Sequence, residues 1–154
     1  MFRQITLCSL LFLFLLFHCG AIDLTDPLSI LGSELEEIFN SESVPDEIFP
    51  NRGEEADEDN VVFYYSNGFY LFLYNNRVWQ VRYDRTFSEK LLNLQMTMSR
   101  SEILSLSLEA GLIPISSDED FVTFQLGDSP YPVRMKLYFT DDQLDDVYVF
   151  RADF

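Results

Sequence analysis

Between residues 61 and 83, three short segments rich in aromatic and β-branched residues follow one another with pairs of turn-forming residues between them. Asn67-Gly68 separates the first two segments, and Asn75-Asn76 separates the second from the third. Asn and Gly tolerate the positive φ angles of a two-residue hairpin turn, so each pair predicts a reversal between antiparallel strands. The pattern predicts a three-stranded meander with strands at 61–66, 69–74 and 77–83.

The next well-defined element carries a complete set of helix boundary signals. Ser99 and Glu102 have the spacing of a capping box, in which each side chain bonds the backbone N–H of the other residue. Gly111 suits the left-handed residue that ends a helix, and Pro114 prevents its continuation. These signals predict a helix over 99–110. Its buried side is expected to comprise Ile103, Leu104, Leu106 and Leu108.

After this helix the sequence returns to the pattern of strands. A segment rich in Gly, Asp and Pro at 127–132 and the sequence Asp141-Asp142-Gln143 predict the intervening turns. In one strand, apolar residues alternate with Arg134 and Lys136, so that strand is expected to have one side in the core and the other in water. The predicted strands are 121–126, 133–139 and 144–151.

The N-terminal part of the domain begins with the pattern of an amphipathic helix over 26–39. Asp26 is a good N-cap, and Pro27 suits the first helical position. Apolar residues then recur at spacings of three and four, which places them on one face. From Asn40 to Asn60, acidic residues predominate and apolar residues are scattered, which is typical of a disordered linker.

Together these elements predict an α+β fold, with a single antiparallel sheet of about six strands and the helix 99–110 packed across one face. Helix 26–39 is expected either to cover remaining apolar surface or to stay apart on its linker. The expected organisation is a signal peptide at 1–21, an amphipathic helix with an acidic disordered linker at 22–60, and the α+β domain at 61–154. The six strands are 61–66, 69–74, 77–83, 121–126, 133–139 and 144–151.

Residues 1–21 have the layout of a secretory signal peptide, with an apolar run from Ile5 to Phe17 and small residues at Gly20-Ala21. The run is shorter than the roughly 20 apolar residues of a membrane-spanning helix. Cleavage is expected to give an exported protein, periplasmic or secreted. Two alternatives stay open. Lipidation at Cys19, which His18 precedes where a small residue is usual, would anchor the protein to a membrane, as would an uncleaved leader.

Cleavage would also remove the only histidine, His18, and both cysteines, Cys8 and Cys19. A mature chain without these residues excludes Ser-His-Asp and Cys-His nucleophile systems and metal sites built from thiolate or imidazole ligands. The sequence contains no glycine-rich phosphate loop and no dinucleotide-binding fingerprint. We therefore expect no cofactor and no metal, and we predict that the protein is not an enzyme.

Carboxylates are the catalytic groups that remain. Two carboxylates across a sugar-sized cleft can hydrolyse glycans, so a carboxylate-based glycan hydrolase is the alternative function. The favoured interpretation is that the acidic clusters are turns with exposed side chains, because Asp readily hydrogen-bonds its own backbone in turns. The clusters are Asp141, Asp142, Asp145 and Asp146, and Asp118-Glu119-Asp120.

The aromatic residues between 63 and 83 suggest a binding surface, because antiparallel sheets often leave one face open. Tyr65, Tyr70 and Trp79 are the candidate partner-binding residues, since aromatic side chains are enriched at protein interfaces. The alternative is that these rings fill the core. The formal net charge of −16 disfavours nucleic acid and favours a protein partner with a neutral or cationic surface. A membrane partner is expected only if Cys19 is lipidated.

The segment from Met96 to Leu104, with Met-Ser-Arg-Ser-Glu-Ile at its centre, resembles the helix entry of the SmpA/OmlA (BamE-type) family of small envelope lipoproteins. Gly111-Leu112-Ile113-Pro114 is similar to the helix stop of that family, whereas Thr97 stands where the family has Gly. The resemblance covers about residues 94–151 and implies a helix followed by a three-stranded sheet, a unit that secreted β-lactamase inhibitor proteins also contain. It implies an assembly-accessory or protein-binding module of the bacterial envelope, with a secreted enzyme inhibitor as an alternative.

Overall fold

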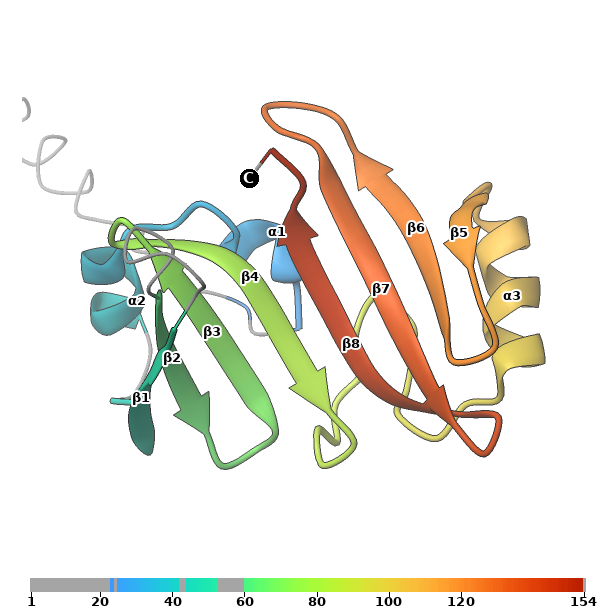
Figure 1. The fold of residues 1–154 in the computed structure, drawn as a ribbon, viewed down its shortest axis with the longest axis horizontal. Helices are drawn as coiled ribbons and strands as arrows, with labels where there is room; N and C mark the ends of the chain where they lie inside the picture. The colour runs from blue at the N-terminus through green and yellow to red at the C-terminus, as the bar shows by residue number, and fades with distance from the viewer. Residues whose placement is uncertain (1–22, 24, 42–43, 53–59, 154) are drawn as a thin grey trace, which may run out of the picture.

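The computed structural model describes residues 23, 25–41, 44–52 and 60–153, which form one eight-stranded antiparallel sheet with three short helices (Figure 1). The strand order across the sheet is β1-β2-β3-β4-β8-β7-β6-β5. The strands are β1 (Glu47–Asn51), β2 (Asn60–Tyr65), β3 (Phe69–Tyr74), β4 (Arg77–Asp84), β5 (Pro114–Ser117), β6 (Phe121–Gly127), β7 (Val133–Thr140) and β8 (Gln143–Arg151). The helices are α1 (Pro27–Ile30), α2 (Leu35–Ser41) and α3 (Arg100–Glu109).

The predicted α+β class, with about six strands packed by helices, is wrong. The fold is mostly β, and its open sheet contains β1 and β5 in addition to strands at the six predicted positions. The two halves of the sheet join through β4 and β8, whose register pairs Val81 with Val149. The prediction missed the outer strands because both are short and each contains a proline, Pro50 in β1 and Pro114 in β5.

The hairpin turns differ in length. Asn75 and Asn76 have φ angles of 48° and 60°, as expected for a two-residue turn with positive φ at both positions. Asp141 and Asp142 form the same kind of turn between β7 and β8. The turn between β2 and β3 instead contains three residues, because Tyr65 pairs with Phe69 and only Gly68 has a positive φ.

The predicted helix 26–39 is two short helices, and the prediction of one continuous helix is wrong. Asp26 caps α1 as expected, and its side chain accepts a hydrogen bond from the Leu28 N–H. The chain then leaves the helix at Gly32, which has a φ of 86° and whose N–H donates to the Val78 carbonyl at 2.8 Å. The break is therefore caused by pairing with the start of β4, a tertiary contact that helical periodicity does not reveal. The Tyr131 hydroxyl donates to the Leu31 carbonyl at 2.5 Å and holds the break from the other half of the sheet.

The N-terminal elements contribute to the common core. Ile30 and Ile38 are fully buried in one apolar cluster with residues of every inner strand. Within the stretch predicted to be a disordered linker, Glu47–Asn51 forms β1 and pairs with β2. The sequence predicts a domain boundary at residue 60, whereas the burial of Ile30 and Ile38 leads us to expect that residues 61–154 do not fold alone. The truncation described in the Discussion tests the boundary.

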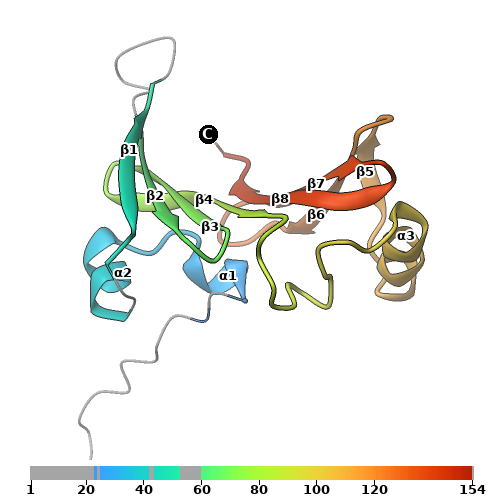
Figure 2. The same cartoon turned by 90° about the horizontal axis from the view of Figure 1, so that it is seen from below.

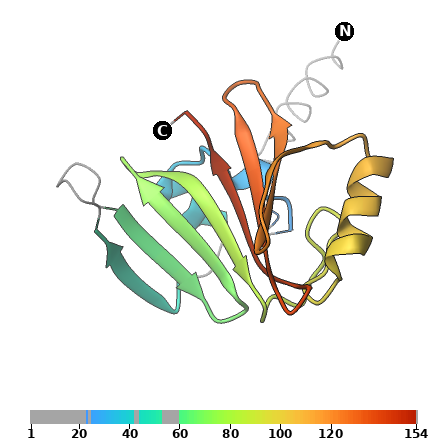
Figure 3. The same cartoon turned by 45° about the vertical axis from the view of Figure 1, so that its right-hand side comes forward.

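Helix α3 begins as predicted, because Ser99 and Glu102 form both hydrogen bonds of the capping box. Gly111, with a φ of 76°, follows its end. The expected apolar side is only partly correct: Ile103 is buried, whereas Leu106 and Leu108 are exposed. The helix lies at the end of the sheet that carries β5 rather than across the middle of a face (Figures 1 and 3).

The two faces of the sheet have different surroundings. All three helices and the connection 85–99 lie against one face, whereas no helix of the described chain lies over the other (Figure 2). The covered face carries the core, and on β7 this alternation is confirmed, with Val133, Met135 and Leu137 buried and Arg134 exposed. We call the opposite surface the open face.

Candidate functional site

The open face carries rows of side chains that cross the sheet in register. One row runs over the six strands from β2 to β6 in the order Tyr64, Tyr70, Arg82, Tyr148, Lys136, Thr123. A second row runs over β4, β8, β7 and β6 in the order Asp84, Asp146, Tyr138, Phe121. Because directly paired residues in a sheet point to the same side, the register places these aromatic and charged groups on one surface.

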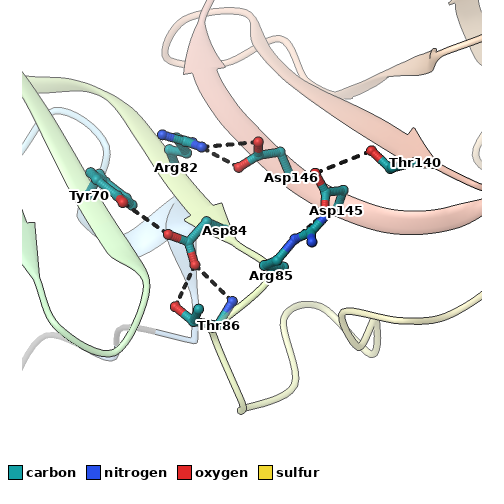
Figure 4. Close-up of polar contacts among 8 residues, drawn as sticks. All are labelled: Tyr70, Arg82, Asp84, Arg85, Thr86, Thr140, Asp145 and Asp146. Carbon is teal, nitrogen blue, oxygen red and sulfur yellow. Dashed lines mark hydrogen bonds and ion pairs between the residues drawn. The ribbon is translucent and has the colours of Figure 1, made fainter.

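Arg82 lies in the first row between Tyr70 and Tyr148, and Figure 4 shows it beside Asp146. Its guanidinium donates two hydrogen bonds to the Asp146 carboxylate, at 2.8 and 3.0 Å. The same group lies over the rings of Tyr70 and Tyr148, at 4.8 and 5.6 Å from their centroids. Although burial would lower the pKa of Arg82, the hydrogen bonds and charge of Asp146 raise it. The guanidinium is therefore held in one position by a bidentate ion pair and two ring contacts.

Asp84 organises the neighbouring polar contacts. The Tyr70 hydroxyl donates to its carboxylate at 2.9 Å, and Thr86 donates through its backbone N–H at 2.8 Å and its hydroxyl at 2.6 Å (Figure 4). Burial raises the pKa of Tyr70 to about 12, and the hydrogen bond to Asp84 adds to this effect. Burial would also raise the pKa of Asp84, but the hydrogen bonds from Thr86 and Tyr70 and the charge of Arg82 lower it overall.

The acidic cluster of the C-terminal hairpin divides between a turn and a strand. Asp141 and Asp142 are exposed in the β7–β8 turn, as predicted. Asp145 and Asp146 lie on β8 instead, where Asp145 pairs with Arg85 and accepts a hydrogen bond from Thr140 at 3.3 Å. Asp84 and Asp146 are register partners, yet the lowered pKa of Asp84 is opposite to what a general acid in glycan hydrolysis requires.

The second half of the open face presents cations on β7. The Lys136 ammonium lies 4.0 Å from the centroid of the Phe121 ring and 4.7 Å from that of Tyr138. Arg134, two residues earlier on the same side, donates to the Gln125 side chain at 3.4 Å. Within the described residues, neither cation forms an ion pair with a carboxylate. The ammonium is positioned by rings and keeps its hydrogen-bonding capacity for other groups.

The structure separates the three aromatic residues predicted to bind a partner. Tyr70 and Trp79 are half-buried on the open face, and Trp79 is the extra residue of a β-bulge opposite Phe72 and Leu73. Tyr65 is buried in the core, against Phe69. Cys19, the residue of the alternative lipidation, lies outside the described residues.

Sequence reasoning did not identify Arg82, Tyr148 and Lys136 as members of one row. These residues are neighbours because β4 pairs with β8, a strand far away in the sequence. The Arg82–Asp146 ion pair, for example, joins two residues more than 60 positions apart. The alternation of Arg134 and Lys136 with apolar residues placed both on the solvent side of their strand, but it contained no signal for the aromatic partners.

The described part of the chain contains no group of three or more His, Cys, Asp or Glu side chains arranged to hold a metal ion. Among the same residues, no helix has the length and apolar character needed to cross a membrane.

No protein-family model and no curated protein matches this chain. Among solved structures, it is similar to the crystal structure of an extracellular protein containing a SCP domain from Bacillus anthracis, with a TM-score of 0.54 and 11% sequence identity. The alignment covers 86% of this chain and 47% of the other, so this chain spans about half the length of that protein. At this identity the likeness shows a shared fold.

Proposed function

We propose that this chain is an exported, non-catalytic module whose open face binds another protein. The observation that carries the proposal is the row from Tyr64 to Thr123, in which three tyrosines and two cations lie in register across the sheet with no helix of the described chain above them. Aromatic residues and Arg are the residue types enriched where protein interfaces are buried.

The open face also favours a binding role because its groups are already positioned. Arg82 is held by Asp146 and two rings, and Lys136 is held over Phe121 and Tyr138. A partner that contacts such side chains does not have to immobilise them, and this lowers the entropic cost of association. The overall charge favours a neutral or cationic partner, whereas Arg134 and Lys136 select carbonyl or carboxylate oxygens within its contact surface.

The alternative functions have less support. For a glycan hydrolase, one carboxyl should have a raised pKa, whereas Asp84 has a lowered one and Asp146 is engaged by Arg82. A secreted enzyme inhibitor and an envelope assembly factor are both protein-binding modules, so they remain as particular forms of the proposed function.

Export is part of the same proposal. It is supported by the apolar leader at residues 1–21 and by the fold shared with an extracellular protein. We propose cleavage near Ala21, which leaves a periplasmic or secreted domain, with lipidation at Cys19 as the alternative that would place the domain on a membrane. The mass of the mature N-terminus distinguishes these outcomes.

Site-specific photocrosslinking in the producing cells tests the binding function. A benzophenone amino acid at Tyr138 or Phe150 is expected to give a discrete crosslinked product, because both residues lie on the open face. The same group at Glu89, in the connection on the covered side, is the matched control and is expected to give none. Equal products from all three positions, or none from Tyr138 and Phe150, would contradict the proposal.

A further inference from the structure

A second surface of the molecule is apolar in a way that the open face is not. Four aliphatic side chains, Leu106, Leu108, Ile113 and Ile115, are exposed on α3, on β5 and on the connection between them. Ile113 is 75% exposed and Leu108 is 65% exposed. We call this surface the α3–β5 end. Exposed aliphatic residues gathered at one end of a molecule mark an interaction surface more often than singly scattered ones do.

In the part of the chain that the structure describes, the outer edge of the sheet is unpaired at this end. β5 is the last strand of the sheet and pairs with β6 only, so its outer edge has no strand beside it among the described residues. α3 and β5 both lie at this end of the sheet (Figures 1 and 3). Arg100 ties the start of α3 to the β5–β6 turn, because its guanidinium donates to the carbonyls of Asp118 and Glu119 at 2.6 and 2.5 Å.

The edge formed by β5 has two features that limit how long a strand can pair with it. β5 starts at Pro114 and has a register shift at Ile115, where the strand bulges away from regular pairing with β6. Proline and bulges are devices that limit sheet-to-sheet association, so this edge does not favour extended stacking of identical chains. A strand of a few residues can still pair with it and place apolar side chains next to Ile115.

The charges around the patch define what such a segment carries. Four exposed carboxylates lie in the same stretch of chain, Glu109 at the end of α3 and Asp118, Glu119 and Asp120 between β5 and β6. Arg100 is the cation beside them, and its guanidinium is directed at backbone carbonyls. A ligand with Lys or Arg next to its apolar residues is complementary in charge to these carboxylates.

We propose that the α3–β5 end docks a short extended segment of a partner protein in which apolar residues alternate with Lys or Arg. This surface is separate from the open face, so it extends the proposed function rather than depending on it. The other exposed edge, at β1, also carries apolar side chains, but it adjoins segments outside the described residues. At the α3–β5 end, the neighbouring chain from residue 100 to 127 is fully described.

A peptide titration on the full mature protein tests this proposal. The probe is a short peptide of alternating Lys and Leu, with a Glu/Leu peptide and a Lys/Ser peptide of equal length as controls, and binding is followed by calorimetry. We expect the Lys/Leu peptide alone to bind. The double variant Ile113→Ser/Ile115→Ser should weaken binding at least about tenfold. Asp118→Asn/Asp120→Asn should weaken it less and should reduce its dependence on salt.

The matched control is Val44→Ser/Ile48→Ser, because these residues at the β1 edge are 77% and 59% exposed, close to the 75% and 51% of Ile113 and Ile115. This variant should bind the Lys/Leu peptide like the unmodified protein, as should Lys136→Gln on the open face. The proposal is overturned if the unmodified protein does not bind the peptide, if the Glu/Leu peptide binds equally, or if the control loses as much affinity as the Ile variant. Self-association that the Ile variant abolishes would assign the surface to a second copy and would also overturn it.

Discussion

The open face and the α3–β5 end are both left without a covering helix in the described chain, yet they are built from different residues. On the open face, Arg82 forms an ion pair with Asp146 and lies over two aromatic rings. The Lys136 ammonium lies over the rings of Phe121 and Tyr138. At the α3–β5 end, Leu108 and Ile113 are exposed with no side chain of the described residues covering most of their surface.

This difference shows two ways in which one sheet can present a surface. The open face is stabilised internally, so its side chains contribute to folding and bind through groups that are already ordered. The aliphatic side chains at the α3–β5 end contribute little to folding, because most of their surface stays in water, and they gain free energy only when a ligand buries it. Substitutions on the two surfaces should therefore differ in their effects on stability.

The largest loss of stability is expected when the N-terminal elements that lie against the covered face are deleted. Deleting residues 22–60 removes Ile30, Leu31 and Ile38 from the core, and each buried side chain of this kind stabilises a fold by roughly 1.5–3 kcal/mol. The loss is comparable with the total stability of a small domain, so we expect no cooperative thermal transition. A cooperative melt of the 61–154 fragment, measured by calorimetry, would show that the domain boundary at residue 60 is real.

The next effect concerns Arg82. Arg82→Ala leaves the partly buried Asp146 without its bidentate partner, and we expect a loss of about 1–3 kcal/mol in the free energy of unfolding. Arg134→Ala is the matched control on the same face, because Arg134 forms no ion pair among the described residues. Urea denaturation measures both. Equal losses would mean that the Arg82 contacts do not stabilise the open face.

A smaller effect is expected from the Tyr70 hydroxyl at high pH. Burial and the hydrogen bond to Asp84 raise its pKa from 10.0 to about 12, so the unfolded chain loses this proton first. The stabilisation is fully present below pH 10 and is lost as the pH rises towards 12. Tyr70→Phe should therefore reduce the decline of stability over this range. Unfolding curves of both proteins measured at each pH that decline in parallel would contradict the pKa shift.

The smallest effect on stability is expected at the α3–β5 end. Ile113→Ser/Ile115→Ser should change the free energy of unfolding by no more than about 0.5 kcal/mol, since both side chains are already exposed in the folded protein. The same variant should bind less of an apolar dye such as anilinonaphthalene sulfonate. A large loss of stability in urea would show that these side chains belong to the core and would remove the contrast between the two surfaces.

Local signals in the sequence predicted the elements that local contacts hold. The capping box of Ser99 and Glu102 and the turn at Asn75-Asn76 formed as expected, because each depends on neighbouring residues. The prediction of one helix over 26–39 was wrong at Gly32, where the backbone N–H donates to the Val78 carbonyl instead of forming a hydrogen bond within the helix. No local pattern contains a contact between residues so far apart in the chain.

The position of Tyr65 shows how one extra residue in a turn determines which side chains of a strand lie on the open face. A two-residue turn at Asn67-Gly68 would have paired Tyr65 with Tyr70 and put both on one face. The actual three-residue turn pairs Tyr65 with Phe69 and Tyr64 with Tyr70. A shift of one residue moves a strand's side chains to the opposite face, so Tyr65 entered the core and Tyr64 joined the open face.

The two lysines of the chain provide the most direct measurement of open-face binding. Lys136 lies on the open face, and Lys90 is exposed in the connection on the covered side. Acylation of both amines, quantified by mass spectrometry, is compared between the purified protein and the protein in its native exported setting. We predict that the ratio of Lys136 to Lys90 labelling falls in the native setting, because a bound partner shields Lys136. An unchanged ratio, with both lysines labelled as in the purified protein, would contradict the account.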